Sequence, residues 1–163
     1  HILYELKDGK KVTESYMDFL TFLKNEGVDF KGRSLSEIWK YTDIQIEQNH
    51  DFIQVVFPLN KPSSNAFHGF YLSDQSEIIK LQNSEIIKSN LIKSARWFLG
   101  FLERRMSWRD GYDHNQLRIT RIIECLRLLV GNEAADTFYK DILLILGTDN
   151  SVNQRTLQFW SEA

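Results

Sequence analysis

The chain has 163 residues, of which 42% are hydrophobic and 26% are charged, and this is the composition of an ordinary globular domain. Its formal net charge of -2 argues against general nucleic-acid binding, which requires a basic surface. Cys125 is the only cysteine, so an intrachain disulfide cannot form. No apolar run approaches the roughly 18 residues that a membrane-spanning helix needs.

Helix signals recur along the chain, whereas the alternating pattern of a strand does not. Apolar residues at helical spacing predict helices over about residues 13–27, 34–39, 42–57, 73–81, 84–105, 113–131, 132–146 and 151–160. We therefore predict an all-α fold, a single-domain bundle of about six to eight helices. Residues 1–15 are expected to form an N-terminal extension and residues 16–163 the helical domain.

Capping residues define the predicted helix ends. Serine, threonine and asparagine side chains accept hydrogen bonds from free N–H groups of a first turn. The predicted N-caps are Thr13, Ser34, Thr42, Ser73, Ser84, Asn132 and Ser151, with Asp113 or Asn115 for the 113–131 helix. Pro58 ends the 42–57 helix because proline restricts the residue before it. Residues 60–70, rich in turn formers, are predicted to be a loop.

The 113–131 helix carries arginines where apolar residues are expected. On a helical wheel Thr120, Glu124 and Arg127 form the polar face, and Arg118 and Arg121 fall within the extended apolar arc. An unpaired buried charge is very costly. Each arginine therefore either binds a carboxylate or helix-end carbonyls, or faces a cleft where an anionic or carbonyl-bearing ligand binds.

A histidine occupies a similar position in the preceding segment. His50 shares an apolar stripe with Ile46, Ile53 and Phe57, and Gln54 lies one turn further on. Such a histidine is either a hydrogen-bonded core residue or an orienting group or general base.

Together these residues predict a polar cluster. The candidate ligand-binding residues are His50, Gln54, His114, Asn115, Arg118 and Arg121, with Trp39 or Trp97 as an apolar wall. Buried polar groups need polar partners, so we expect His50 to lie close to the two arginines. No catalytic residue is assigned. The histidines and Cys125 lack metal-ligand spacing, so we expect no metal and no cofactor.

Four segments carry a family resemblance. "HDFIQVVFPL" from His50 and "HNQLRITRIIECLRLLVG" from His114 resemble the two long motifs of the opioid growth factor receptor conserved domain. "GRSLSEIWKY" from Gly32 and "RTLQFWSEA" from Arg155 resemble the opening and closing motifs of bacterial members, in the same order. Val55 departs from the family pattern, which often has tryptophan there.

The resemblance implies an all-helical, receptor-like domain. The vertebrate member is described as a receptor for an enkephalin peptide, associated with nuclear and perinuclear membrane. We accordingly expect a soluble, cytoplasmic binding module for a peptide or small anion, without a transmembrane segment; peripheral membrane association would follow the family. The alternatives are an enzyme acting on a small anionic or amide substrate, with a histidine as base, and a purely structural polar network. The sequence assigns no oligomeric state.

Overall fold

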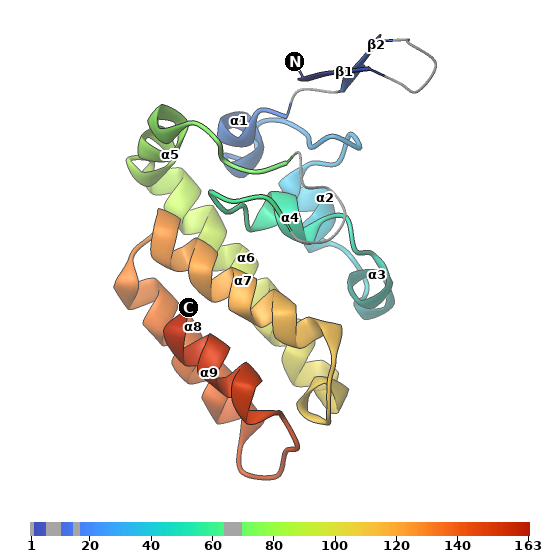
Figure 1. Cartoon of the computed structure of the whole chain (residues 1–163), viewed down its shortest axis with the longest axis vertical. Helices are drawn as coiled ribbons and strands as arrows, with labels where there is room; N and C mark the ends of the chain where they lie inside the picture. Colours follow the sequence, from blue (N-terminus) through green and yellow to red (C-terminus); the bar gives the residue numbers. More distant parts are fainter. Residues whose placement is uncertain (1, 6–10, 15–16, 64–69) are drawn as a thin grey trace.

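The computed structural model describes residues 2–5, 11–14, 17–63 and 70–163, and within them the domain is built from α-helices (Figure 1). The helices are α1 Phe19–Leu23, α2 Leu35–Trp39, α3 Asp43–Gln48, α4 Ile53–Val56, α5 Gln75–Gln82, α6 Glu85–Arg104, α7 His114–Leu129, α8 Asn132–Leu146 and α9 Gln154–Glu162. A 3₁₀ turn, η1, spans Met106–Arg109. The prediction of an all-α fold is confirmed. Part of the predicted 60–70 loop lies outside the described residues.

The described residues contain nine α-helices rather than six to eight, because the helix predicted over 42–57 is two helices. Thr42 begins α3 with the expected capping box, in which Gln45 returns the hydrogen bond. At Asn49 the backbone is extended (φ -85°, ψ 127°), which interrupts the helical hydrogen bonds. The chain becomes helical again at Ile53, and Pro58 follows the end of α4, as predicted.

Several helix starts differ from the prediction. Ser34, Ser84 and Asp113 are N-caps, as predicted. Elsewhere a neighbouring Asp or Asn carries the cap, because its side chain accepts a hydrogen bond from the N–H two residues ahead. Asp74 replaces Ser73 and Asn153 replaces Ser151. The prediction of Asn132 as an N-cap was also wrong. Asn132 is the first residue of α8, and Gly131 is its N-cap, with φ 139°.

The prediction that the first helix begins at Thr13 was wrong. Thr13 lies in a strand, β2 (Lys11–Glu14), which pairs antiparallel with β1 (Ile2–Glu5). The first helix begins only at Phe19, after Asp18, whose carboxylate accepts from the N–H groups of Leu20 and Thr21. The β-branched residues Val12 and Thr13 favour extended backbone, and no strand was expected from alternation over so short a segment.

Helix α7 is the central element of the bundle. It packs against α5, α6, α8 and α9, and in Figure 1 it runs beside α6 with α8 and α9 beyond it. The predicted polar face of α7 is therefore partly covered: Arg127 donates to Ala163, Asn132 and Asp136. Leu117 of α7 is 50% exposed although its side chain is apolar.

Candidate functional site

Arg118 is almost fully buried and holds the end of α3. Its Nη1 donates to the carbonyl of Ile46 at 2.9 Å and to Asn115 Oδ1 at 3.2 Å, and its Nη2 donates to the carbonyl of Asn49 at 2.6 Å. The guanidinium also lies 5.3 Å from the ring centre of Phe52, a cation–π contact. A cation at a helix C-terminus satisfies its free carbonyls and offsets the negative end of the helix dipole.

Arg121, one turn further along α7, holds the end of α4 in the same way. Its Nε donates to the carbonyl of Phe57 at 2.8 Å, and its Nη2 lies 3.5 Å from the carbonyl of Gln54. The two arginines thus fix the two short helices α3 and α4 against α7. Binding to helix-end carbonyls is one of the alternatives that the sequence left open for the two arginines.

Neither arginine has a carboxylate within 4.0 Å among the described residues. Burial lowers the pKa of Arg118 to about 10 and also lowers that of Arg121, because the cation loses hydration that carbonyl groups replace only in part. Glu47 and Asp113 offset part of this effect at Arg118, and Glu124 does so at Arg121. Both guanidinium groups remain short of negative charge.

The two arginines line one cavity of about 640 Å³, which we call the α7 cavity. Its lining consists of His50, Ile53, Gln54, Leu59, Lys61, Pro62, Ser63, His114, Leu117, Arg118, Thr120, Arg121 and Glu124. Lys61 forms an ion pair with Glu124 at 2.8 Å, so these two charges compensate each other. The uncompensated charge of the cavity therefore comes from the two arginines.

The structure brings most of the predicted cluster together. His50, Gln54, His114, Arg118 and Arg121 all line the α7 cavity, and Gln54 Oε1 is buried without a described hydrogen-bond partner. Asn115 lies behind the lining, where its Oδ1 accepts from Arg118 and its Nδ2 donates to Glu47. The expected closeness of His50 to the arginines is confirmed.

The tryptophans do not form a wall of the α7 cavity. The indole of Trp39 donates to Ser94 Oγ at 2.9 Å, and Lys93 lies 4.3 Å from its ring centre. Trp97 packs edge-on against Phe52 in the core. The apolar lining comes instead from Ile53, Leu59 and Leu117. Helical spacing places a tryptophan on the buried face but does not say which neighbour it meets.

His50 and His114 both line the α7 cavity and form a pair, with ring centres 5.1 Å apart. His114 Nε2 lies 3.2 Å from Glu47 Oε1, but not in hydrogen-bond alignment. Burial lowers the pKa of His50, and the charges of Arg118 and His114 lower it further, against the opposing effect of Glu47 and Asp51. His50 is therefore held mainly in its neutral form near pH 7.

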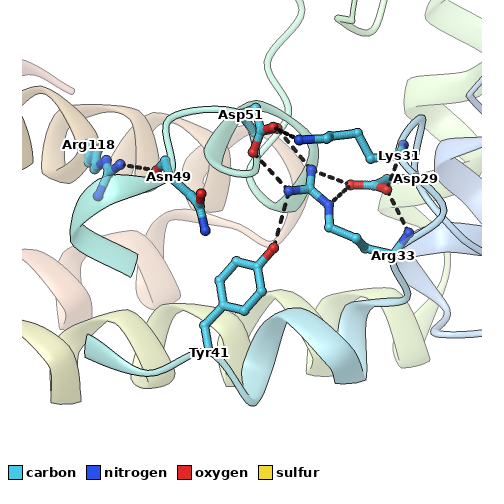
Figure 2. Close-up of polar contacts among 7 residues, drawn as sticks. All are labelled: Asp29, Lys31, Arg33, Tyr41, Asn49, Asp51 and Arg118. Atoms are coloured by element: carbon cyan, nitrogen blue, oxygen red, sulfur yellow. Dashed lines mark hydrogen bonds and ion pairs between the residues drawn. The ribbon is translucent and has the colours of Figure 1, made fainter. Parts of the chain in front are cut away.

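A network that the sequence did not suggest positions the segment carrying His50 (Figure 2). Arg33, before α2, donates to Asp29 Oδ2 at 2.8 Å, Asp51 Oδ1 at 2.8 Å and the Tyr41 hydroxyl at 3.2 Å. Lys31 also binds Asp51, and Arg118 holds the carbonyl of Asn49 from the other side. Residues 49–51 are thus held between two arginines from distant parts of the chain.

The buried partner in this network is Asp29, whose side chain is fully inaccessible. Its Oδ1 also accepts from the backbone N–H groups of Lys31 and Arg33. Burial acts to raise the pKa of Asp51, but hydrogen bonds from Lys31 and Arg33 outweigh it and hold that pKa below its usual value. The sequence signal for this network was the charged residues Asp29, Lys31 and Arg33 around Gly32. Charged residues beside a glycine more often form a solvated turn.

One group of side chains in the described part of the chain has the chemistry of metal ligands. Glu47, Asp113 and His114 place one ligand atom each within 4.8 Å of one another. Asp113 already accepts from the Asn115 N–H as the N-cap of α7, and Glu47 accepts from the Asn115 side chain. These hydrogen bonds from Asn115, in the first turn of α7, account for the positions of both carboxylates.

The family model described as the opioid growth factor receptor conserved region matches residues 20–163. The chain belongs to the opioid growth factor receptor family. The opioid growth factor receptor of Rattus norvegicus is 29% identical over 130 aligned positions, which cover 66% of this chain and 22% of the receptor. The opioid growth factor receptor-like protein 1 of Rattus norvegicus is 27% identical over 192 positions, covering 96% of this chain and 41% of that protein.

The Homo sapiens opioid growth factor receptor is 32% identical over 102 positions, covering 50% of this chain and 14% of the receptor. The chain therefore spans less than half the length of these curated relatives. No solved structure matches the chain. Within the described residues, no helix is both long and apolar enough to cross a membrane.

Both long segments that resemble the opioid growth factor receptor family contribute residues to the lining of the α7 cavity. Residues 50–59 contribute His50, Ile53, Gln54 and Leu59, and the motif beginning at His114 contributes α7. Val55, where the family often has tryptophan, is fully buried in the core and does not line the cavity. Its substitution therefore changes core packing rather than the cavity wall.

Proposed function

We propose that this domain is a binding module for a small anionic or peptide-like ligand, which occupies the α7 cavity. One observation carries the proposal: Arg118 and Arg121 are largely buried, line a common cavity, and have no carboxylate partner among the described residues. An anion would supply the charge that both guanidinium groups lack, and arginine is the side chain best suited to bind oxyanions.

The size and lining of the cavity support a ligand larger than a single ion. A volume of about 640 Å³ is within the range of small-molecule sites. Ile53, Leu59 and Leu117 offer apolar surface beside the charges, and Gln54 Oε1 accepts no hydrogen bond from the described residues. Several relatives are named as receptors for opioid growth factor, and a peptide would present a carboxylate beside amide and apolar groups.

The test uses Leu117, because this residue lines the cavity and is half exposed without holding a helix end. Leu117→Glu places a carboxylate beside the arginines and should compete with an external anion. We expect N-acetyl-diglycine, but not its neutral amide, to raise the melting temperature of the wild type. At 100 times its Kd the ligand adds about 2.7 kcal/mol, or roughly 5–10 °C for a domain of this size.

Two controls separate the effect of charge from that of altered packing. Leu117→Gln has the same shape without the charge and should keep the response to the ligand. Leu144→Glu adds the same charge on α8, at a residue that is 79% exposed and does not line the cavity, and should also keep it. If no anionic probe stabilises the wild type, or if Leu117→Glu responds as well as Leu117→Gln, the cavity is not an anion site.

A second candidate function is catalysis, favoured by the histidine pair. His50 and His114 lie together in the cavity with the arginines, and Glu47 approaches His114. A neutral histidine could act as a general base on a substrate whose anionic or carbonyl group is bound by the arginines. Incubation of the wild type with a panel of acylated amino acids, followed by mass spectrometry, would detect turnover; binding without any change of mass would support the binding module instead.

A further inference from the structure

Several side chains that line the α7 cavity carry hydrogen-bond donors. Arg118 and Arg121 each use part of the guanidinium to hold a helix end, through the hydrogen bonds given above. No described residue accepts a hydrogen bond from Arg118 Nε or Arg121 Nη1. His50 lines the cavity from the segment between α3 and α4. Two arginines from α7 and a histidine from the segment between α3 and α4 therefore line the same cavity.

The charge of the cavity depends on His50. Two guanidinium groups contribute two positive charges, which the carbonyls at the ends of α3 and α4 and the nearby carboxylates of Glu47 and Asp113 offset only in part. The Lys61–Glu124 pair contributes nothing net. Protonation of His50 therefore adds one positive charge to a cavity whose arginines have no carboxylate partner among the described residues.

The groups that face His50 explain why it is neutral in the empty cavity. Arg118 and His114 approach it from α7 and disfavour its protonation, as does burial. Glu47 from α3 and Asp51 from its own segment act in the opposite direction. An anion bound at Arg118 would offset the positive charge that disfavours protonation of His50, so His50 would gain a proton more easily.

We propose, building on the proposed function, that the α7 cavity takes a tetrahedral dianion, a phosphoryl or sulfate-type group, together with one proton on His50. A tetrahedral group has at least three terminal oxygens, which match donors from two arginines and a histidine, whereas a planar carboxylate has two. The proton on His50 would offset the second negative charge of the dianion. A monoanion would bind without uptake of this proton.

Inorganic sulfate is the first probe, because it remains a dianion across the pH range in which histidine titrates. Binding is measured by isothermal titration calorimetry at constant ionic strength between pH 7.5 and 5.5. We expect the affinity of the wild type to rise as the pH falls, by at most about tenfold per pH unit, the limit for uptake of one proton. His50→Gln should lose this pH dependence, while Arg96→Gln, an exposed change on α6, should keep it.

The second probe is a pair of compounds of the same shape. Phenyl phosphate is a dianion above its second pKa of about 6, and phenyl sulfate is a monoanion with the same skeleton. At pH 7.0 we expect the phosphate to bind about tenfold more tightly and to take up a proton, seen as a heat that varies with the ionisation enthalpy of the buffer. Leu117→Glu should abolish binding of both compounds. This result would show that neither compound binds elsewhere on the protein.

The outcomes distinguish this inference from the proposed function. If N-acetyl-diglycine binds but sulfate and phenyl phosphate do not, the cavity is an anion site and the dianion assignment is wrong. If sulfate binds with an affinity that does not change with pH, or if His114→Gln rather than His50→Gln removes the change, the proton is not on His50. If nothing binds, both the inference and the proposed function fail.

Discussion

Replacing Arg118 by alanine tests whether a buried arginine joins α7 to the end of α3. The variant loses three hydrogen bonds, to the carbonyls of Ile46 and Asn49 and to Asn115 Oδ1. A hydrogen bond contributes about 1 kcal/mol net, and the carbonyls left behind are partly buried. We therefore expect a loss of about 3 kcal/mol in the free energy of unfolding, and a melting temperature lower by roughly 6–12 °C.

The assay is urea unfolding followed by tryptophan fluorescence, with Arg96→Ala as the matched control. Arg96 is exposed on α6, so its removal should change stability by no more than about 0.5 kcal/mol. Arg127, which the helical wheel placed on a polar face, is not a neutral control because it donates to Ala163 and Asp136. Equal unfolding midpoints for Arg118→Ala and Arg96→Ala would refute the reasoning, because the carbonyls would then be satisfied equally well by water.

The other predictions concern pH, the Arg33 network and the thiol. Because the pKa of His50 is lowered by folding, its contribution to stability is complete above the unfolded value of about 6.5 and is lost as the pH falls below it. The melting temperature should therefore fall more steeply below pH 6.5 for the wild type than for His50→Gln, and parallel curves would contradict the shift. Arg33→Met should destabilise the domain by about 3 kcal/mol in urea unfolding, since it strips a fully buried carboxylate, Asp29, of its cation; a double variant with Asp29→Asn should recover part of this loss. Burial raises the pKa of the Cys125 thiol to about 12, so a thiol reagent at pH 8 should label the protein only in denaturant, and rapid native labelling would show that the thiol is accessible.

Much of the fold was predictable from local signals. The periodicity of apolar residues determined that the domain is helical, and capping residues such as Ser34, Thr42 and Ser84 marked helix starts correctly. Such signals act within one turn of helix, and so they can be read from neighbouring residues. The N-caps Asp74 and Asn153 also depend on local sequence, because they lie one and two residues after the predicted N-caps Ser73 and Ser151.

The membership of the polar cluster was also predictable in part. Arg118, Arg121 and His50 each stand on an apolar stripe, and a polar residue in such a place must find a polar partner. That requirement brought them together in the prediction without any knowledge of the tertiary structure. The requirement does not specify the partners, which proved to be the carbonyls at the ends of α3 and α4.

The sequence by itself determined an all-helical domain of the opioid growth factor receptor family with buried polar residues at particular places. Only the tertiary structure decided that α3 and α4 are separate helices, that Trp39 faces Ser94, and that Arg33 holds the His50 segment. The physical reason is distance along the chain. Periodicity and capping depend on residues within a few positions, whereas Arg33 and Asp51, or Arg118 and Asn49, meet across 18 and 69 residues and are joined only when the bundle packs.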